Sequence, residues 1–571
     1  MNRYKLARKN IANLIDVNPS TLTYVLYVEK IEQSYKIINI PKKSGGTRDI
    51  CIPSPQLKSV QRKLANMLCT KHSEYVVYNN INQAVSHGFE RKRSIITNAS
   101  NHKNKKYLLN VDILDFFDSF HFGRVKGFFK KNRNFVFSEE EATIIAQLSC
   151  YKGKLPQGAP TSPIIANLIF NIVDLQILKL AKKYRVYYTR YADDLSFSTD
   201  MNKFKNMLPS FLKELKLLLE KHGFELNDEK TRLQTRECRQ EVTGVTVNEK
   251  LNPCPIFVRK TRAMADRLYK TGDIYLEGCV DDEDISLKKK RLEGRFCFIN
   301  QFDSFNNMIE YGHNNSKLYK KHQAKLNKRE TQYQRFLFYK HFYNPDAPLL
   351  VTEGITDIIH IESALMKHYV RYPRLITKTE KGFEFNFKFL NRTDKLKFFF
   401  GISEDGADTM VNIYNYYSGT NCTNIDKILE KKLPPKQSMG TRNPVILIFD
   451  NEQQGNKKPL KKFLNYSRKK LNGNLYSRIC SNLYLQTIPL VNNKDECEIE
   501  DLYSEDLSSI KINGKTFLKK SNENSENYFG KSRFADFIKN NYSDINFDNF
   551  IPLLDCINEI IEGEKKILVI S

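Results

Sequence analysis

The sequence lacks the features that mark membrane-spanning and secreted proteins. No run of about 18 apolar residues occurs, and the N-terminus, MNRYKLARKN, leads into polar sequence rather than into an apolar signal core. We therefore expect a cytoplasmic protein with no membrane partner. Its 11 cysteines are scattered, without a C-x-x-C pair or a Cys/His cluster at zinc spacing, which argues against a zinc module and a disulfide framework.

Acidic residues are scarce in the first part of the chain. Residues 1–340 carry 59 Lys and Arg against 35 Asp and Glu, whereas residues 341–571 carry 32 against 30, so the net charge of +26 belongs mostly to the first part. A positive field of this size favours a polyanion, and nucleic acid is the commonest such partner. Solubility alone is the alternative explanation.

Helical and β-rich segments alternate along the chain, which predicts an α/β multidomain protein. The 571 residues are enough for more than one core. A basic, helix-compatible stretch at 316–340 precedes a proline-containing breaker at 344–348, and a new apolar strand follows at 349–351. We therefore predict a first domain at 1–315, a basic linker at 316–347 and a second domain at 348–571.

Three aspartates of the first domain stand where strands are expected to end. Asp112 closes the strand-like run 108–112, and Asp193 and Asp194 form the turn between two short strands in 186–197. Phosphoryl transfer from a nucleoside triphosphate uses two Mg²⁺ ions held by carboxylates. An Asp-Asp pair alone is typical of a surface turn, but a third acid on an adjacent strand favours a metal site.

Several segments around these acids occur in a shared order. The box Tyr-Ala-Asp-Asp at 191–194 resembles the Y-x-D-D box of reverse transcriptases, and Asp112 matches the first metal-binding aspartate of that family. Between them, LPQGAPTSP at 155–163 is similar to the family's L-P-Q-G-x-x-x-S-P segment. Segment 223–230 resembles the motif whose lysine lies near the triphosphate, and segment 41–48 resembles the phosphate clamp of the fingers.

The resemblance implies a right-hand polymerase that has fingers and a palm with an antiparallel sheet at about 1–240 and a basic thumb at about 241–315. Asp112 and Asp193 would be the main ligands of two Mg²⁺ ions, and Asp194 would complete the cluster. Phe117 would exclude a ribose 2′-hydroxyl and so select dNTPs, the alternative being core packing. The residues implied to bind substrate are Lys42, Lys43, Arg48, Phe117, Gln157, Gly158 and Lys230.

Two short signatures narrow the resemblance to bacterial retron reverse transcriptases. Asn98 to His102 matches their N-A-x-x-H signature and Val242-Thr243-Gly244 matches their V-T-G signature, which marks Asn98, His102, Val242, Thr243 and Gly244 as RNA-binding residues. Such enzymes bind a cognate noncoding RNA, prime from a guanosine 2′-OH and make branched RNA-linked single-stranded DNA (msDNA). A host RNase H would remove the template. A group II intron or other mobile-element reverse transcriptase is the alternative.

Acidic residues also follow two apolar strands of the second domain. Glu353 and Gly354 come after the strand at 349–351, and Asp450 and Glu452 come after the continuous apolar run 445–449. Such runs are typical of buried parallel strands, whose carboxyl ends carry ligand sites. The pattern resembles the TOPRIM domain of OLD-family nucleases, topoisomerases and primases, which has a mostly parallel sheet. The resemblance implies that Glu353, Asp450 and Glu452 hold one or two Mg²⁺ ions for phosphodiester chemistry.

One position departs from the TOPRIM pattern, because Glu452 stands where the motif has its second aspartate. Asp357 and the later acids Glu498, Glu500 and Asp501 would complete a second metal site, the alternative for the three later acids being a solvated acidic face. The whole pattern implies a nuclease effector restrained by the RNA–DNA product in a toxin–antitoxin system of antiphage defence. A ribonucleoprotein scaffold with an inactive second domain is the alternative, and the resemblance leaves a homo-oligomer open.

Overall fold

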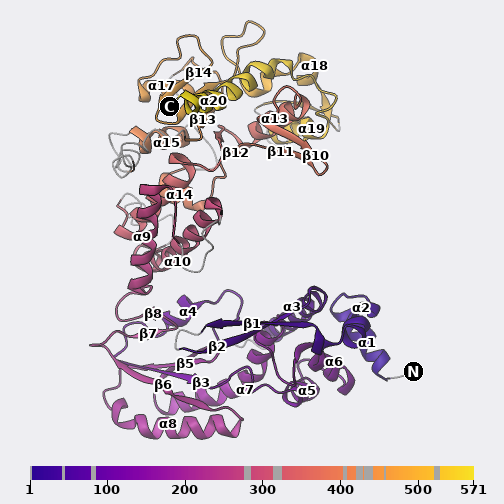
Figure 1. Ribbon diagram of the computed structural model, residues 1–571, viewed down its shortest axis with the longest axis vertical. Coiled ribbons are helices and arrows are strands. Elements are labelled where there is room, and N and C mark those ends of the chain that lie inside the picture. The colour runs from indigo at the N-terminus through magenta and orange to yellow at the C-terminus, as the bar shows by residue number, and fades with distance from the viewer. Residues whose placement is uncertain are drawn as a thin grey trace. The chain divides into compact units, whose positions relative to one another are not determined.

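The computed structural model describes residues 3–41, 45–78, 85–275, 284–312, 325–402, 408–418, 429, 442–455, 458–512, 514–519 and 527–570. The chain forms two compact units, Met1–Pro255 and Ile256–Ser571 (Figure 1). Each unit has a sheet of its own, and the two sheets are built on different plans.

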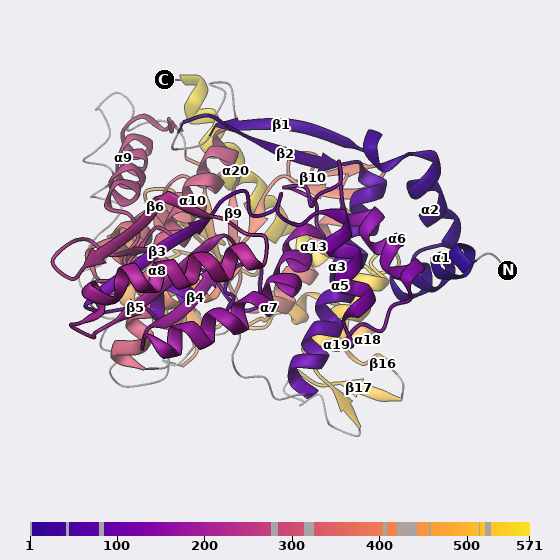
Figure 2. The ribbon, with the colours of Figure 1, turned by 90° about the horizontal axis from the view of Figure 1, so that it is seen from below.

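The first unit is organised around a four-stranded antiparallel sheet. Its strand order is β4 (Tyr187–Tyr191), β5 (Asp194–Thr199), β3 (Tyr107–Ile113) and β6 (Leu226–Thr235). Two hairpins form separate two-stranded sheets. They are β1 (Tyr35–Pro41) with β2 (Thr47–Pro53), and β7 (Glu241–Val242) with β8 (Val245–Thr246). The β1–β2 hairpin forms a long arm, seen at the top of Figure 2. Strand β3 lies inside the sheet and is buried along almost its whole length, as its apolar sequence requires.

Helices surround this sheet. They are α1 (Arg3–Leu14), α2 (Pro19–Thr23), α3 (Pro55–Tyr78), α4 (Ile95–Ser100), α5 (Phe122–Lys131), α6 (Glu139–Ser149), α7 (Ser162–Lys183) and α8 (Phe204–Lys221). Capping boxes begin two of them, through Ser94 and Thr97 in α4 and through Ser138 and Glu141 in α6. Helix α7 is long and apolar enough to cross a membrane by length and composition, but 67% of its most apolar window is buried, which is typical of a core helix.

The second unit contains a five-stranded, mostly parallel sheet. The strand order is β12 (Lys388–Phe389), β9 (Leu349–Val351), β13 (Val445–Phe449), β15 (Leu483–Thr487) and β14 (Tyr476–Cys480), and only β14 is antiparallel to its neighbour. Alternate residues of β13 enter two different apolar cores: Val445, Leu447 and Phe449 face one, and Ile446 and Ile448 face the other. The continuous apolar run of β13 is therefore explained by burial on both faces.

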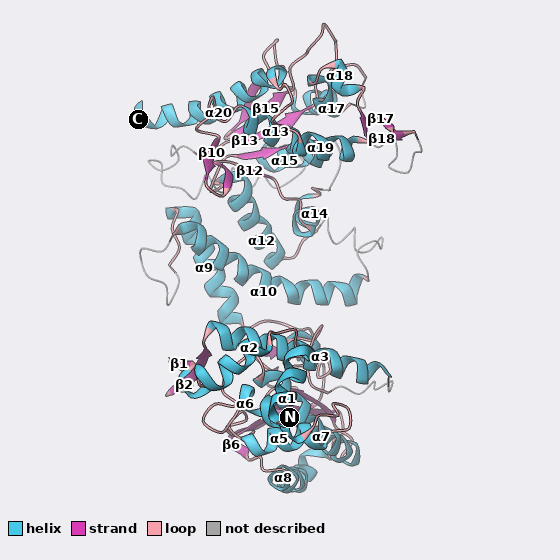
Figure 3. Ribbon diagram, turned by 90° about the vertical axis from the view of Figure 1, so that its right-hand side faces the viewer, coloured by secondary structure: helices cyan, strands magenta, loops and turns pink. Residues whose placement is uncertain are grey.

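Helices cover both faces of this sheet (Figure 3). One core takes residues from α9 (Pro255–Thr271), α10 (Ile285–Tyr311), α12 (Lys328–Phe338), α14 (Asp394–Phe400), α15 (Asp408–Ser418) and α17 (Pro459–Ser467). The other takes residues from α13 (Ile355–Lys367), α19 (Lys531–Asn540) and α20 (Ile551–Ile570). The remaining short elements are β10 (Ile376–Thr379), β11 (Gly382–Phe385), α18 (Glu505–Ser508), β16 (Lys511–Ile512), β17 (Lys515–Phe517) and β18 (Tyr528–Phe529).

The structure divides the chain at a different place from the sequence prediction. Helices α9 and α10, which fall in the predicted thumb, share an apolar core with α12 and the second sheet. The predicted linker at 316–347 is also wrong for its described part, because Tyr333, Phe336 and Phe342 are buried in that core. Aromatic residues between the basic ones bury one face of α12, and net charge alone did not reveal this amphipathic pattern.

Candidate functional site

Three aspartates of the first unit meet at one end of its sheet. Asp112 in β3 is the register partner of Asp194 in β5. Asp193 lies in the turn between β4 and β5, and its carbonyl oxygen accepts a hydrogen bond from the Ile113 amide at 3.1 Å. Ala192 has a φ of 56°, in the left-handed region, which closes this turn tightly. The structure thus brings together the three acids that the sequence predicts as polymerase metal ligands.

The electrostatics of this cluster suit a divalent cation. Burial raises the pKa of Asp193, and burial together with the charges of Asp193 and Asp112 raises the pKa of Asp194 to about 7. The Lys230 Nζ donates to both carboxylate oxygens of Asp112, at 3.0 and 3.1 Å. Carboxylates that are costly to ionise side by side are stabilised by Mg²⁺, because its charge offsets their repulsion.

Neither acidic site of the chain is a finished metal cage. Within the described residues no three Asp, Glu, His or Cys side chains stand close enough to hold a metal ion as they are. The fit of the first site to Mg²⁺ therefore rests on the donor chemistry of the three carboxylates and on the raised pKa values of Asp193 and Asp194.

A cleft of about 370 Å³ opens beside the three aspartates. Asp112, Asp194 and Lys230 line it, together with Thr243 and Gly244 of the β7–β8 turn. That turn is tight, with φ values of 47° and 78° at Thr243 and Gly244. The structure therefore places two residues of the V-T-G signature at the edge of the acidic cleft.

The segment at 155–163 packs against the β1–β2 hairpin. The Cys51 amide donates to the carbonyl oxygen of Gln157 at 2.7 Å. Gly158 has a φ of 112°, and a Cβ there would lie 2.6 Å from the Cys51 carbonyl oxygen, so only glycine fits. Arg48 on β2 is exposed, and its charge acts on Asp193. Lys42 and Lys43, predicted beside it, lie outside the described residues.

Phe117 packs against two other rings but is only half-buried. Its ring centroid lies 5.5 Å from that of Phe116 and 6.2 Å from that of Phe89, and the side chain is half-buried. Its contact with the sugar of a nucleotide stays a prediction.

Three residues predicted to bind RNA are buried instead. Asn98, His102 and Val242 are each 0% exposed, which leaves them no surface for an RNA contact. The His102 ring lies 2.7 Å from both Thr189 Oγ1 and Ser198 Oγ, and Thr189 Oγ1 donates to Asn98 Oδ1 at 2.6 Å. Asn98 and His102 therefore hold the two strands of the hairpin that carries Asp193 and Asp194.

Two further supports of the hairpin escaped the sequence analysis. Arg190 on β4 forms a fully buried ion pair with Asp174 on α7, at 2.8 Å, and also donates to the Ala192 carbonyl oxygen. A Cβ at Gly88 would lie 2.6 Å from the Ala192 amide nitrogen, so a glycine is needed where the segment that contains Gly88 passes the turn. The arginine stands directly before the Y-x-D-D box, but only the fold reveals its distant partner.

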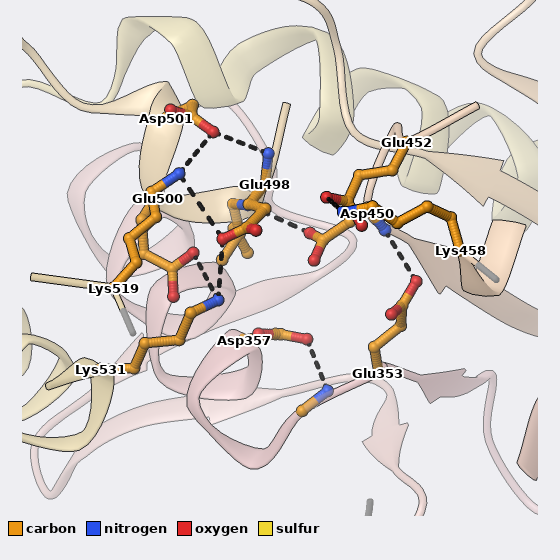
Figure 4. Close-up of polar contacts among 12 residues, drawn as sticks. Glu353, Asp357, Asp450, Glu452, Lys458, Glu498, Glu500, Asp501, Lys519 and Lys531 are labelled. Atoms are coloured by element: carbon orange, nitrogen blue, oxygen red, sulfur yellow. Dashed lines mark hydrogen bonds and ion pairs between the residues drawn. The ribbon is translucent and has the colours of Figure 1, made fainter. Parts of the chain in front are cut away.

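The second unit assembles another acidic group (Figure 4). Glu353 follows β9 and Asp450 follows β13, and the Asp450 amide donates to Glu353 Oε1 at 3.1 Å. Asp450 Oδ1 accepts a hydrogen bond from the Ile499 amide, also at 3.1 Å. Asp357 Oδ2 accepts from the Gly354 amide at 2.8 Å and thereby caps α13. Three chain segments thus converge at the carboxyl ends of two parallel strands.

Burial and mutual repulsion make these acids hard to ionise. Burial is the main cause that raises the pKa of Glu353 to about 8 and of Asp357 to about 6, and the pKa of Asp450 also lies well above its usual range. Glu353, Asp357 and Glu500 are the charges that raise the pKa of Asp450 further. Glu500 is 1% exposed, and its Oε1 has no hydrogen-bond partner. A buried oxygen without a partner suits a cation ligand.

Lysines surround the rim of this group. Glu452 is paired with Lys458, and its charge contributes to the raised pKa of Glu353. Lys531 lies 3.1 Å from Glu498 and 3.0 Å from Glu500, and Lys519 lies 2.7 Å from Asp501. We call Glu353, Asp357, Asp450 and Glu500 the acid cluster. Its rim consists of the acids Glu452, Glu498 and Asp501 and of the lysines that pair with them, Lys458, Lys531 and Lys519. Of the three later acids, only Glu500 acts on Asp357 and Asp450.

Comparison with known proteins agrees with the geometry of the first unit. Residues 40–247 match the family model described as reverse transcriptase (RNA-dependent DNA polymerase). That range contains strand β2, the four-stranded sheet, the three aspartates and the V-T-G turn.

The similar relatives are retron enzymes. The retron Ec86 reverse transcriptase of Escherichia coli is 31% identical, over 41% of this chain and 68% of its own, and the retron Ec73 enzyme of the same species is 30% identical over 46% and 82%. The retron Mx65 reverse transcriptase of Myxococcus xanthus is 32% identical over 42% of this chain and 57% of its own. The chain belongs to the retron reverse transcriptase family. It spans just over half of the length of the two Myxococcus relatives that it matches.

Proposed function

We propose that the first unit is an RNA-directed DNA polymerase that copies a cognate noncoding RNA into msDNA. The observation that carries the proposal is the meeting of Asp112, Asp193 and Asp194 at one end of the sheet, beside a cleft that Asp112, Asp194 and the V-T-G turn line. Mg²⁺ bound by these carboxylates would activate the attacking hydroxyl and neutralise the pyrophosphate. Lys230, which contacts Asp112, would meet the phosphates of a dNTP.

The test is to express the gene with its flanking locus and to purify the protein with its bound nucleic acid. We expect a short DNA whose mobility shifts after RNase treatment, and we expect it to be absent from the Asp193→Asn variant. RNA alone in the wild-type preparation would contradict msDNA synthesis. Mobilisation or splicing of an RNA would instead favour a mobile-element reverse transcriptase.

We propose further that the second unit is a Mg²⁺-dependent nuclease of the TOPRIM type. The specific support is that Glu353 and Asp450 follow adjacent parallel strands and that Glu500 offers a buried oxygen without a partner. At this site Glu353 would also exchange a proton near neutral pH, because burial raises its pKa to about 8. The experiment is Mg²⁺-dependent cleavage of labelled DNA and RNA, which Glu353→Gln should abolish without loss of DNA synthesis.

The two activities together fit a cytoplasmic bacterial antiphage system in which msDNA restrains the nuclease. Its partners would be the noncoding RNA, dNTPs and a host RNase H. Growth arrest by the chain without its RNA locus, relieved by Glu353→Gln, would support this arrangement. Metal-independent DNA binding without cleavage would favour a scaffold with an inactive second unit.

A further inference from the structure

A stretch without any acidic residue begins three residues after Asp450 of the acid cluster. Residues 453–474 contain seven lysines and arginines and no aspartate or glutamate, although residues 341–571 as a whole are almost neutral. The stretch begins next to Glu452, runs through α17 and ends in the turn after that helix. Positive charge in the second half of the chain is therefore concentrated beside the acidic site.

The described residues of this stretch form a hollow of about 570 Å³. Its wall includes the cations Lys461, Arg468, Lys469 and Lys470 and the amide side chains of Gln453 and Asn465. We call it the basic hollow. Its polar side chains offer many hydrogen-bond donors and no carboxylate, which is the chemistry of an anion site.

The cations of the hollow differ from the neighbouring lysines of α17 and its start in their lack of an acidic partner among the described residues. Lys458 is paired with Glu452, and Lys462 is paired with Asp408. Throughout the part of the chain that the structure describes, no acidic side chain pairs with the four cations of the hollow wall. Like charges gathered around one hollow repel one another, and a bound polyanion removes that cost.

The basic hollow begins within three residues of the acid cluster. Gln453 lines the hollow and follows Asp450 by three residues. Consecutive Cα atoms are 3.8 Å apart, so the Cα atoms of these two residues are separated by at most about 11 Å. A helical nucleic acid strand rises about 3.4 Å per nucleotide, so about three nucleotides bridge that span.

We propose that the basic hollow binds the phosphodiester backbone of the nucleic acid strand that the acid cluster cuts. The proposal rests on the nuclease function proposed above and adds the surface that holds the substrate. Lysine and arginine contacts to phosphates carry no sequence information, so binding is independent of sequence and strongly dependent on salt. DNA and RNA share this backbone, and the experiment separates them.

Lysine footprinting on the full chain tests the hollow without depending on cleavage. The Glu353→Gln protein is acetylated with and without a 20-nucleotide DNA or RNA strand of the same sequence, and each lysine is quantified by mass spectrometry. Acetylation of Lys461, Lys469 and Lys470 should fall at least threefold with one or both strands. Lys381, Lys511 and Lys539, which are exposed elsewhere on this unit, should be unchanged.

Two results of the footprint overturn the proposal. One is equal acetylation of Lys461, Lys469 and Lys470 with and without both strands. The other is equal protection by inorganic phosphate, which would make the hollow a site for small anions. Protection by DNA alone or by RNA alone identifies the strand that the hollow holds.

Cleavage kinetics then test whether the hollow binds the strand that is cut. A variant with Lys461, Arg468, Lys469 and Lys470 all changed to Gln should raise KM for cleavage at least tenfold and leave kcat within twofold. The slope of log KM against log salt should fall by about 3, because each cation on a single strand contributes about 0.7. A control with the same charge loss elsewhere on the unit replaces Lys381, Lys511, Arg533 and Lys539 with Gln and should cleave as the wild type does.

The failure of the nuclease function and the failure of the hollow are distinguishable. No cleavage by the wild-type protein, with the footprint still present, contradicts the nuclease and leaves a nucleic acid site. Cleavage with an unchanged KM in the hollow variant contradicts the hollow and leaves the nuclease.

Discussion

The two acidic sites are built on opposite strand arrangements. In the first unit, antiparallel pairing places Asp112 opposite a hairpin turn, so two of the three acids are neighbours in sequence. In the second unit, parallel strands end at the same edge, and Glu353 and Asp450 lie 97 residues apart. The acids of a hairpin site are therefore recognisable as a short sequence motif, whereas those of a parallel-sheet site are far apart in the sequence.

The two sites also differ in how their acids are neutralised. Lys230 contacts Asp112 directly in the first unit. In the second unit Lys531 contacts the rim acid Glu498 and the buried Glu500, while Asp450 accepts only a backbone hydrogen bond among its described contacts. If the two sites are chemically separate, then removing a carboxylate from one must not abolish the activity of the other, although loss of msDNA would release the nuclease that it is proposed to restrain.

The largest expected effect comes from exchanging one acid in each site. Asp112→Asn should lower DNA synthesis by about 10³-fold, and Asp450→Asn should lower nuclease activity by a similar factor, because metal ions supply several kcal/mol to such reactions. Both activities are measured on both variants with the same preparations. Asp115→Asn and Asp495→Asn, changes of exposed neighbours, are the matched controls. Loss of both activities in either variant would contradict the assignment of one activity to each site.

The buried ion pair behind the hairpin gives the next largest effect. Arg190→Met should destabilise the first unit by about 3–5 kcal/mol, because Asp174 would keep a buried charge without its partner. Hydrogen exchange of the peptide 186–199 and urea unfolding followed by circular dichroism measure it. Asp174→Leu combined with Arg190→Met should recover much of the loss, and Lys63→Met, which removes an exposed pair, should change little. Unchanged exchange in Arg190→Met would show that the pair does not hold the hairpin.

The glycine beside the turn gives a smaller effect that acts on catalysis. Gly88→Ala places a Cβ 2.6 Å from the Ala192 amide nitrogen and 3.2 Å from the Tyr191 carbonyl carbon, so backbone must move. A displacement of about 1 Å at the aspartates costs about 10²-fold in rate. Primer extension by the first unit measures it, and nuclease activity should be unaffected. Gly127→Ala, which meets open space within a helix, is the control and should retain full activity.

The sequence predicts the first site better than the second, because the acids of the first site lie in short motifs and those of the second are far apart in the chain. The three palm aspartates and the alternation of helices and strands are local patterns, and the structure brings the aspartates together as expected. The sequence names Asp357 and Glu500 only as candidates for a second metal site, and tertiary folding across the intervening helices and strands brings their charges to act on Asp450. The buried role of His102 was missed because a short motif does not say whether its polar residues face solvent or a neighbouring strand.

The smallest expected effect is the pH dependence of stability that His102 confers, and it tests whether this residue supports the hairpin. Thr189 gives its only hydroxyl proton to Asn98, so His102 donates through Nε2 and accepts from Ser198 through Nδ1. Burial accordingly lowers the pKa of His102 to about 3. Below pH 6.5 the unfolded chain binds a proton that the folded chain does not, so the free energy of unfolding falls as the pH falls.

This histidine should cost the first unit about 2 kcal/mol between pH 7 and pH 5. His102→Gln removes the titrating group, so its urea midpoint should fall less over that interval than the wild-type midpoint, although it starts lower at pH 7. Equal pH dependence in the His102 variant and the wild type would mean that the ring is protonated when folded, and that the hydrogen-bond chain from Asn98 to Ser198 does not brace the turn at Asp193.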